Sequence, residues 1–311
     1  MTVFMFPGQG AQKVGMGADL LAVPEVSHVY EVASEVCGVD VAHLSRSGTA
    51  EEVNDAFNAQ VLTVAVSVGV AKALESRGIR PDAAVGFSLG QISALMATNA
   101  LSLEDGFSLL GVRARSMAAA CVEHPGAMYA LLGASHEDAQ AVCEECAAGE
   151  VLVCANYNAP GQVVVSGALS AIDRTEICWR EKGKRGARLN TAGAFHSPLM
   201  EPAADAVRAK CAELTWREPD VPVICNTDAA PFVVAEAASR LAAQVVSPVL
   251  FEQSISALAA QGNRAFAEVG YGAVLNGLVR RIDKKAERMR VGTLDELDAL
   301  LQTASEEAGK E

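Results

Sequence analysis

The sequence is short of positive charge. Its 311 residues hold 25 Lys and Arg against 38 Asp and Glu, which gives a formal net charge of −13 at pH 7. A phosphate backbone would be repelled over most of such a surface, so nucleic acid is excluded as the main partner. Charged residues make up only 20% of the chain and hydrophobic residues 50%. This balance excludes global disorder and predicts one large domain or two unequal ones.

The sequence also lacks the patterns of a secreted or membrane protein. Residues 1–6 run directly into a Pro-Gly turn without a signal peptide, and charges or turn residues interrupt each apolar run before about 18 to 20 residues. The eight cysteines lie mostly in apolar surroundings, which favours free thiols. The pair Cys143 and Cys146 falls inside a predicted helix and has no second Cys-x-x-Cys, so no metal site is predicted. We expect a cytoplasmic protein with no membrane partner.

Short apolar strands alternate with helices in the first and last parts of the chain. Strands are predicted at 3–6, 82–87, 221–225, 265–269 and 290–292, and the alternation indicates a parallel sheet covered on both faces. Residues 127–190 instead follow the order β-α-β-β-α-β, which is that of a ferredoxin-like unit. The sequence therefore predicts an α/β fold. A large hydrolase-like domain is expected at 1–125 and 191–311, with a small ferredoxin-like α+β domain inserted at 126–190.

A candidate nucleophile lies between a predicted strand and a predicted helix. Gly86-Phe87-Ser88-Leu89-Gly90 fits the Gly-x-Ser-x-Gly pattern of a nucleophile elbow. The serine of such an elbow sits on a sharp turn, where neighbouring chains approach so closely that glycine is needed on either side. The first N–H groups of the following helix point at any oxyanion formed there.

A serine nucleophile needs a base, and the chain has only five histidines. His196 precedes a predicted helix just after the small domain, where a loop on a rigid scaffold could aim it. The other four lie in segments that suggest surface or structural roles: His28, His43, His124 and His136. No histidine follows His196 and no His-Gly-Gly loop precedes the elbow, so a standard α/β-hydrolase is disfavoured. The early Gly8-Gln9-Gly10 loop lacks the spacing of a dinucleotide fingerprint or a P-loop, which predicts no bound NAD or nucleoside triphosphate cofactor.

Several motifs, in one order along residues 2–295, together resemble a known family. They are Phe6-Pro7-Gly8-Gln9-Gly10-Ala11-Gln12, the elbow, Arg113 with Met117, Gly126-Ala127-Met128, Asn156-x-Asn158-x-Pro160-x-Gln162-Val163-Val164-x-Ser166-Gly167, Ala194-Phe195-His196-Ser197 and Glu268-Val269-Gly270. The chain resembles the malonyl-CoA:acyl carrier protein transacylases of fatty-acid synthesis, which are relatives of the acyltransferase domains of polyketide synthases.

The resemblance implies a two-step transfer through a malonyl-serine ester. Ser88 would attack the thioester of malonyl-CoA while His196 takes its proton, and the phosphopantetheine thiol of acyl carrier protein would then receive the acyl group. In this family a backbone carbonyl orients the histidine, and the matching residue is Gln244. The oxyanion donors carried over are the backbone N–H groups of Gln9 and Leu89. The resemblance implies no metal and no cofactor besides malonyl-CoA as substrate.

The resemblance also implies how the malonyl group is recognised. Arg113 would bind the malonyl carboxylate, because a planar guanidinium donates two parallel hydrogen bonds to a carboxylate and stays charged when buried. Arg115 is expected to face elsewhere, because residues i and i+2 lie on different sides of a helix. Phe195 matches an aromatic residue that the family associates with malonyl rather than methylmalonyl substrates.

Two residues beside the nucleophile depart from the family's pattern. Its elbow commonly has His and Glu where this chain has Phe87 and Gln91, which leaves the local polarity and the acyl preference open. The alternatives are an acyltransferase of a polyketide pathway, a hydrolase such as a thioesterase or lipase, and a non-catalytic scaffold. Arg113 and the missing third acid argue against a hydrolase, and the intact Ser88 and His196 argue against a scaffold.

The expected carrier protein is strongly acidic, so its docking on a chain of net charge −13 requires a local positive patch. Two basic clusters are candidates: Arg180, Lys182, Lys184, Arg185 and Arg188 in the first, and Arg280, Arg281, Lys284, Lys285, Arg288 and Arg290 in the second.

Overall fold

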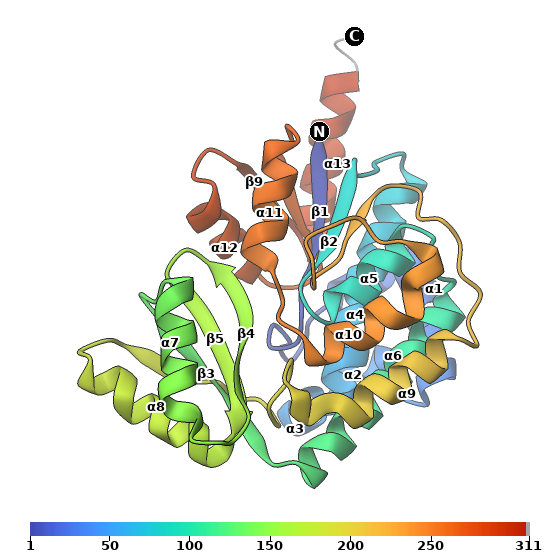
Figure 1. Cartoon of the computed structure of the whole chain (residues 1–311). Coiled ribbons are helices and arrows are strands. Elements are labelled where there is room, and N and C mark those ends of the chain that lie inside the picture. Colours follow the sequence, from blue (N-terminus) through green and yellow to red (C-terminus); the bar gives the residue numbers. More distant parts are fainter. Residues whose placement is uncertain (309–311) are drawn as a thin grey trace.

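A five-stranded parallel sheet forms the centre of the large domain (Figure 1). Its strand order is β7-β2-β1-β8-β9. The structure, a computed structural model, describes residues 1–308. The four strands from β7 to β8 are mostly buried, as expected where helices cover both faces, whereas the edge strand β9 is mostly exposed. The bounds are β1 (Thr2–Phe6), β2 (Ala83–Gly86), β7 (Val223–Ile224), β8 (Ala265–Val269) and β9 (Glu287–Val291).

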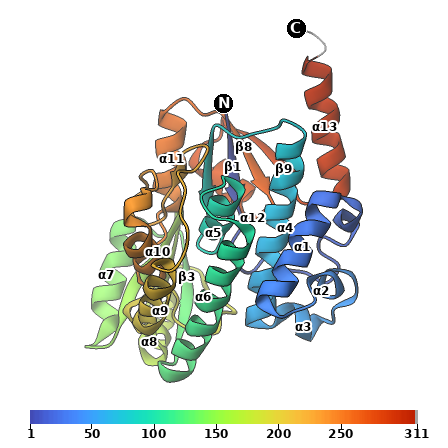
Figure 2. The same cartoon turned by 90° about the vertical axis from the view of Figure 1, so that its right-hand side faces the viewer.

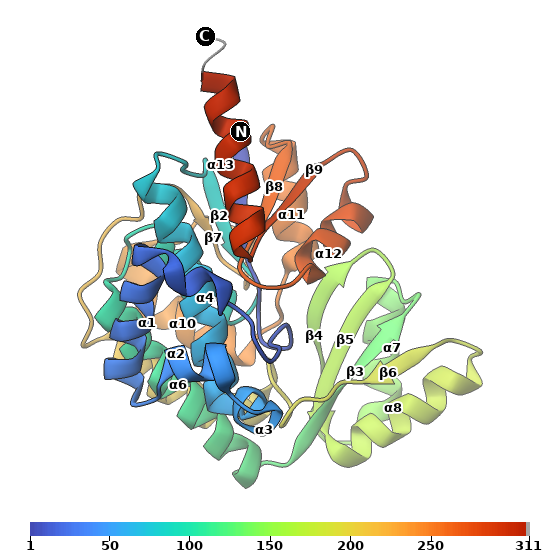
Figure 3. The same ribbon diagram turned by 180° about the vertical axis from the view of Figure 1, so that it is seen from behind.

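Alternate side chains of β1 enter two separate cores. Phe4 and Phe6 pack with α1, α4, α5, α6, α9 and α10, whereas Val3 and Met5 pack with α11 and α12. Figure 2 places α1 and α4 on one side of the sheet and α11 on the other. The helices of the large domain are η1 (Asp19–Ala22), α1 (Pro24–Cys37), α2 (Val41–Ser47), α3 (Ala50–Asn54), α4 (Ala56–Ser76), α5 (Gly90–Ala97), α6 (Leu103–Glu123), η2 (Pro198–Met200), α9 (Glu201–Cys211), η3 (Val234–Glu236), α10 (Ala237–Val246), α11 (Phe251–Ala260), α12 (Val274–Ile282) and α13 (Leu294–Ala308). The C-terminal end of α13 extends beyond the body of the domain (Figure 3).

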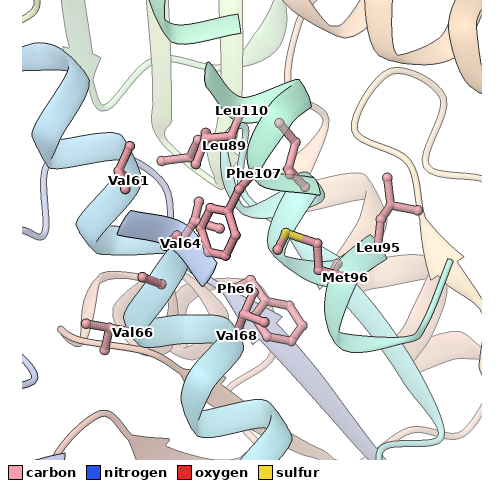
Figure 4. Close-up of a cluster of buried hydrophobic side chains, with 14 of the residues drawn as sticks. Phe6, Val61, Val64, Val66, Val68, Leu89, Leu95, Met96, Phe107 and Leu110 are labelled. Carbon is pink, nitrogen blue, oxygen red and sulfur yellow. The ribbon is translucent and has the colours of Figure 1, made fainter. Parts of the chain in front are cut away.

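The long helix α4 lies inside the large domain. By length and composition it could cross a membrane, although Lys72 interrupts its uncharged run after residues 56–71. The side chain of Asp55 caps its first turn, which lets the helix begin before the apolar stretch. Yet 83% of its most apolar window is buried within the protein, and Figure 4 shows Val64 close to Phe6 and Phe107 in one apolar cluster. The helix is therefore a core element of the large domain.

The small domain is a four-stranded antiparallel sheet in the order β4-β5-β3-β6, with two helices packed on one face. This order is that of a ferredoxin-like unit. The elements are β3 (Gly126–Leu132), α7 (His136–Ala147), β4 (Leu152–Ala159), β5 (Gln162–Ala168), α8 (Leu169–Glu181) and β6 (Gly186–Arg188). The predicted fold class is thus confirmed, and the predicted domain limits at 126–190 stay a prediction.

The two domains meet along the edge strand β4. Val249 of the large domain bridges it: Tyr157 N donates to Val249 O at 2.9 Å, and Val249 N donates to Ala155 O at 2.9 Å. Arg281 on α12 donates to Pro160 O at 2.9 Å, at the turn between β4 and β5. One face of the small sheet is covered by α7 and α8. These bonds hold its other face over the carboxyl ends of β1 and β2, where ligands bind in open parallel sheets.

Several predicted boundaries shift by a few residues in the structure. The segment 18–47 contains η1, α1 and α2, and the segment 197–214 contains η2 and α9, which ends at Cys211. Proline fits only the first turn of a helix, and both α1 and α9 have one there. The last strand, expected at 290–292, is β9 and begins at Glu287.

Candidate active site

The chain turns sharply between β2 and α5, and Ser88 stands at that turn. Its φ is 51°, in the left-handed region that residues with a side chain rarely occupy. A Cβ on Gly86 would lie 1.9 Å from the carbonyl carbon of Gly90, and one on Gly90 would lie 2.0 Å from the oxygen of Phe6. Both glycines are therefore required by close approach of the backbone, as the elbow pattern predicts.

His196 lies beside the nucleophile and has a fixed tautomer. Its Nδ1 is 2.9 Å from the backbone oxygen of Gln244, which can only accept, so Nδ1 carries the proton. Its Nε2 is then an acceptor, and the hydroxyl of Ser88 donates to it at 2.7 Å. His196 is buried and has a φ of 57°. Two strained residues that meet in one hydrogen bond are a feature of functional sites.

The low basicity of His196 leads to a prediction for the pH dependence of acylation. Burial, together with the positive charge of Arg113, lowers the pKa of His196 from 6.5 to about 4. A lowered pKa keeps the imidazole neutral, and so able to accept a proton, until the pH falls to about 4. We expect kcat/KM for acylation by malonyl-CoA to stay level from pH 7 down to about pH 5, and to fall by half only near pH 4.

Single-turnover acylation measured across this pH range checks the prediction, with circular dichroism at each pH as the control for folding. A loss of rate centred near pH 6.5, in protein that is still folded, would mean that His196 is not held neutral by burial.

Arg113 reaches the nucleophile from α6. Its side chain is 4% exposed, and its Nη2 donates to the Ser88 Oγ at 3.3 Å. Its Nη1 donates to Gln60 Oε1 at 2.9 Å, and its Nε has no partner in the structure. Burial lowers the pKa of Arg113 to about 10, which leaves it charged at neutral pH. No Asp or Glu side chain that the structure describes lies within the 4.0 Å of an ion pair with it.

A pocket of about 150 Å³ joins these groups. The backbone N–H groups of Gln9 and Leu89 border it and donate to no acceptor within residues 1–308, so both are free to bind an oxyanion. Phe195 lines it, and Gln244 lies behind His196. Met117, Met128 and Asn156 also line the pocket, and no role in it was predicted for them from the sequence.

An amide side chain that the sequence analysis missed supports the elbow from below. Asn226 Oδ1 accepts from Ser88 N at 2.8 Å, and its Nδ2 donates to Gly86 O at 2.6 Å. The side chain of Gln244 adds a bond from Nε2 to Ser88 O at 2.6 Å. Asn226 follows β7, the neighbour of β2, so its position at the carboxyl edge of a parallel sheet is the signal that could have found it.

The support by Asn226 can be tested through acylation. In Asn226→Ala the strained turn loses two bonds, and the hydroxyl of Ser88 should move away from His196. We expect the maximal acylation rate to fall roughly 10- to 100-fold for malonyl-CoA and acetyl-CoA alike, with little change in KM. Rapid-quench mass spectrometry measures both rates. Asn263→Ala, another buried asparagine of the large domain, is the control and should lower stability alone. A loss confined to malonyl-CoA would contradict this role.

The two departures at the elbow have separate places in the structure. The ring of Phe87 packs edge-on against Phe251, with centroids 5.4 Å apart. Gln91 lies below the elbow, where its Oε1 accepts from Asn226 N at 3.1 Å. Phe87 borders the pocket, whereas Gln91 is not among its lining residues. Gln91 therefore contacts Asn226 and Gln244 below the elbow rather than the pocket.

The other candidates lie outside the pocket. Arg115 donates to Cys37 O at 3.2 Å and covers the ring of Phe57, so it faces away from Ser88 as predicted. His136 bonds Glu252 at 3.2 Å, between the two domains. No group of three or more metal-binding side chains occurs among the described residues.

The two basic clusters differ in how much of their charge is compensated. In the first, Lys182, Lys184 and Arg188 form ion pairs within the small domain, whereas Arg180 and Arg185 have none among the described residues. In the second, Arg281 holds the turn of the small domain and Arg290 pairs with Glu296. The remaining members of the second cluster have no ion pair within the described part of the chain: Arg280, Lys284, Lys285 and Arg288.

Comparison with known proteins gives the same relationship over nearly the whole chain. Residues 3–295 match the acyl transferase domain family. The chain is 36% identical over 308 residues to the malonyl CoA-acyl carrier protein transacylase of Bacillus subtilis, covering 98% of this chain and 97% of that one. The structure is similar to the malonyl-CoA:acyl carrier protein transacylase of Xanthomonas oryzae, with a TM-score of 0.93, 38% identity and coverage of 97% and 98%. It is also similar, with a TM-score of 0.93, 31% identity and coverage of 97% and 99%, to a malonyl-transacylase in complex with its type II PKS acyl carrier protein.

Proposed function

This chain belongs to the malonyl-CoA–acyl carrier protein transacylase family of acyl transferase domains, and we propose that it moves a malonyl group from malonyl-CoA to the phosphopantetheine thiol of an acyl carrier protein. The observation that supports this best is the charge of the pocket. Arg113 is buried without a carboxylate partner and donates to the oxygen of the nucleophile at 3.3 Å. A buried charge requires a counter-ion, and an acyl group that ends in a carboxylate brings one.

In the first half of the reaction, Ser88 Oγ attacks the thioester carbon and its proton passes to His196 Nε2. The carbonyl oxygen becomes an oxyanion between the N–H groups of Gln9 and Leu89, and each such donor is worth about 3 kcal/mol of barrier. Collapse breaks the carbon–sulfur bond, and His196 returns the proton to the departing thiolate. Free coenzyme A leaves, and the malonyl group stays on Ser88 as an ester.

In the second half, the thiol of the carrier's phosphopantetheine takes the place of coenzyme A. His196 accepts the thiol proton, and the sulfur attacks the ester carbon of malonyl-Ser88. The oxyanion forms between the same two N–H groups. When it collapses, the bond to Ser88 Oγ breaks and His196 gives the proton back to that oxygen. The backbone oxygen of Gln244 holds the ring in place in both directions.

The partners that follow are malonyl-CoA with its product coenzyme A, and an acyl carrier protein. We place carrier docking at the second basic cluster, because only Arg290 of its six members forms an ion pair within the described part of the chain, against three of the five members of the first cluster. We also place the protein in the cytoplasm, where thiols stay reduced. The support for this is that all eight cysteines are free, including Cys143 and Cys154, whose sulfurs are only 3.9 Å apart.

A polyketide pathway remains the second candidate for the carrier, because the structural relative bound to its carrier belongs to such a system. Fatty-acid synthesis is the first, because it is the pathway of the family's stand-alone enzymes that the sequence resembles. The chemistry at Ser88 is the same in both. The difference lies in which carrier protein docks.

Intact-mass spectrometry after mixing with malonyl-CoA tests the proposed function. We expect one malonyl adduct, mapped to Ser88 by peptide analysis, which holo-carrier protein removes quickly and water removes slowly. Rapid loss to water would instead identify a hydrolase, and the absence of an adduct would identify a scaffold.

A further inference from the structure

We propose that Gln60 determines the carboxylate selectivity of the pocket, because it holds the guanidinium of Arg113 with a neutral amide and so leaves the positive charge for the substrate. This inference rests on the proposed function, since it concerns the same pocket and the same acyl group.

The contact joins two core helices beside the pocket, which Arg113 lines and Gln60 does not. Gln60 projects from the first turns of α4 and Arg113 from the middle of α6, and both side chains are almost fully buried, at 3% and 4% exposure. Gln60 Oε1 accepts from Arg113 Nη1 at 2.9 Å. Among the described residues, the only other hydrogen-bond partner of the guanidinium is Ser88 Oγ, at 3.3 Å from Nη2. The amide oxygen therefore fixes one end of the guanidinium and directs the other end at the reacting atoms.

The choice of an amide at this position is unusual in physical terms. Buried charged groups are normally paired with an opposite charge, because an isolated ion in a low dielectric is costly. A glutamate at position 60 would have the same length and would supply that charge. The chain instead has glutamine, so the orientation of Arg113 is kept while its charge stays uncompensated until a substrate enters. An acyl group without a carboxylate gains nothing from this arrangement.

Gln60→Glu is the direct test because it changes charge at nearly constant shape. A carboxylate at position 60 would pair with Arg113 and repel the malonyl carboxylate. We expect acylation by malonyl-CoA to fall by about 100-fold, and acylation by acetyl-CoA to change by less than about threefold. The decisive quantity is the ratio of the malonyl-CoA rate to the acetyl-CoA rate, because a variant that merely disturbs the fold lowers both rates together.

Gln60→Met distinguishes the effect of an added charge from the effect of a misplaced Arg113. It also tests the inference if the glutamate variant does not fold. It removes the hydrogen bond without adding a charge, so the malonyl preference should fall by only about fivefold. Asn58→Asp adds the same charge on the same helix, two residues earlier and on another side, and should leave the ratio unchanged.

The measurement is rapid-quench acylation by malonyl-CoA and acetyl-CoA, read as the mass adduct on Ser88 of the full chain. Wild-type protein without a malonyl adduct would overturn the proposed function itself. A normal wild-type adduct with an unchanged ratio in Gln60→Glu would overturn only the inference. Equal losses of preference in Gln60→Glu and Gln60→Met would also overturn it, because position alone would then explain the effect.

Discussion

Ser88→Ala should form no malonyl adduct and should transfer malonyl groups to holo-carrier on the order of 10⁵-fold more slowly than the wild type. The oxygen that forms the ester is lost, and the free N–H groups of Gln9 and Leu89 can still bind an oxyanion but have no covalent intermediate to stabilise. The remaining transfer rate should be the low residual rate that is typical of an active site without its nucleophile. Intact-mass spectrometry and radiolabel transfer measure the two quantities.

Ser93→Ala is the matched control for this variant. Ser93 is a buried serine of α5, the helix that follows the elbow, and its hydroxyl has no partner in the structure. Removing that hydroxyl should leave the adduct and the transfer rate near wild type. If Ser88→Ala kept a malonyl adduct, the nucleophile would have to be another residue, and the two-step scheme through the elbow would be wrong.

Arg113→Ala should invert the acyl preference rather than inactivate the protein. We expect acylation by malonyl-CoA to fall on the order of 10³-fold, because two charge-assisted hydrogen bonds to the carboxylate are lost. Acylation by acetyl-CoA should stay the same or rise, because the cavity of about 150 Å³ grows and loses a charge that an apolar group does not use. The pKa of His196 should also rise, because Arg113 contributes to its lowering.

Arg115→Ala is the control from the same helix. This arginine binds a backbone oxygen and an aromatic face away from the pocket, so its loss should lower the melting temperature and leave acyl preference unchanged. A parallel loss of malonyl and acetyl acylation in Arg113→Ala would contradict the account, because it would make the guanidinium a structural group.

Local sequence patterns predict the parts of the site that depend on backbone shape. The glycines of the elbow, the strand before it and the helix after it are consecutive in the chain, so their spacing indicates the turn and its nucleophile. The same holds for the ferredoxin-like order of the small domain. His196 could be singled out because the chain has few histidines, but its partner, the backbone oxygen of Gln244, came from the family resemblance alone.

Contacts between distant helices could not be predicted in this way. Gln60 and Arg113 are 53 residues apart, and neither lies in a pattern that distinguishes it from other polar residues of a helix. Asn226 is 138 residues from the Ser88 amide that it binds. Its place beside the elbow depends on the order of strands in the parallel sheet, which sequence spacing does not determine. Helix α4 illustrates the same limit, because its burial follows from tertiary packing and its composition also suits a membrane.

The most direct test of the central claim is a crystal structure of the protein trapped with malonyl-CoA. The account predicts an ester on Ser88 Oγ, a carbonyl oxygen between the N–H groups of Gln9 and Leu89, and a carboxylate that accepts two hydrogen bonds from Arg113. A malonyl group attached elsewhere, or one whose carboxylate points to solvent while Arg113 stays bound to Ser88, would contradict it.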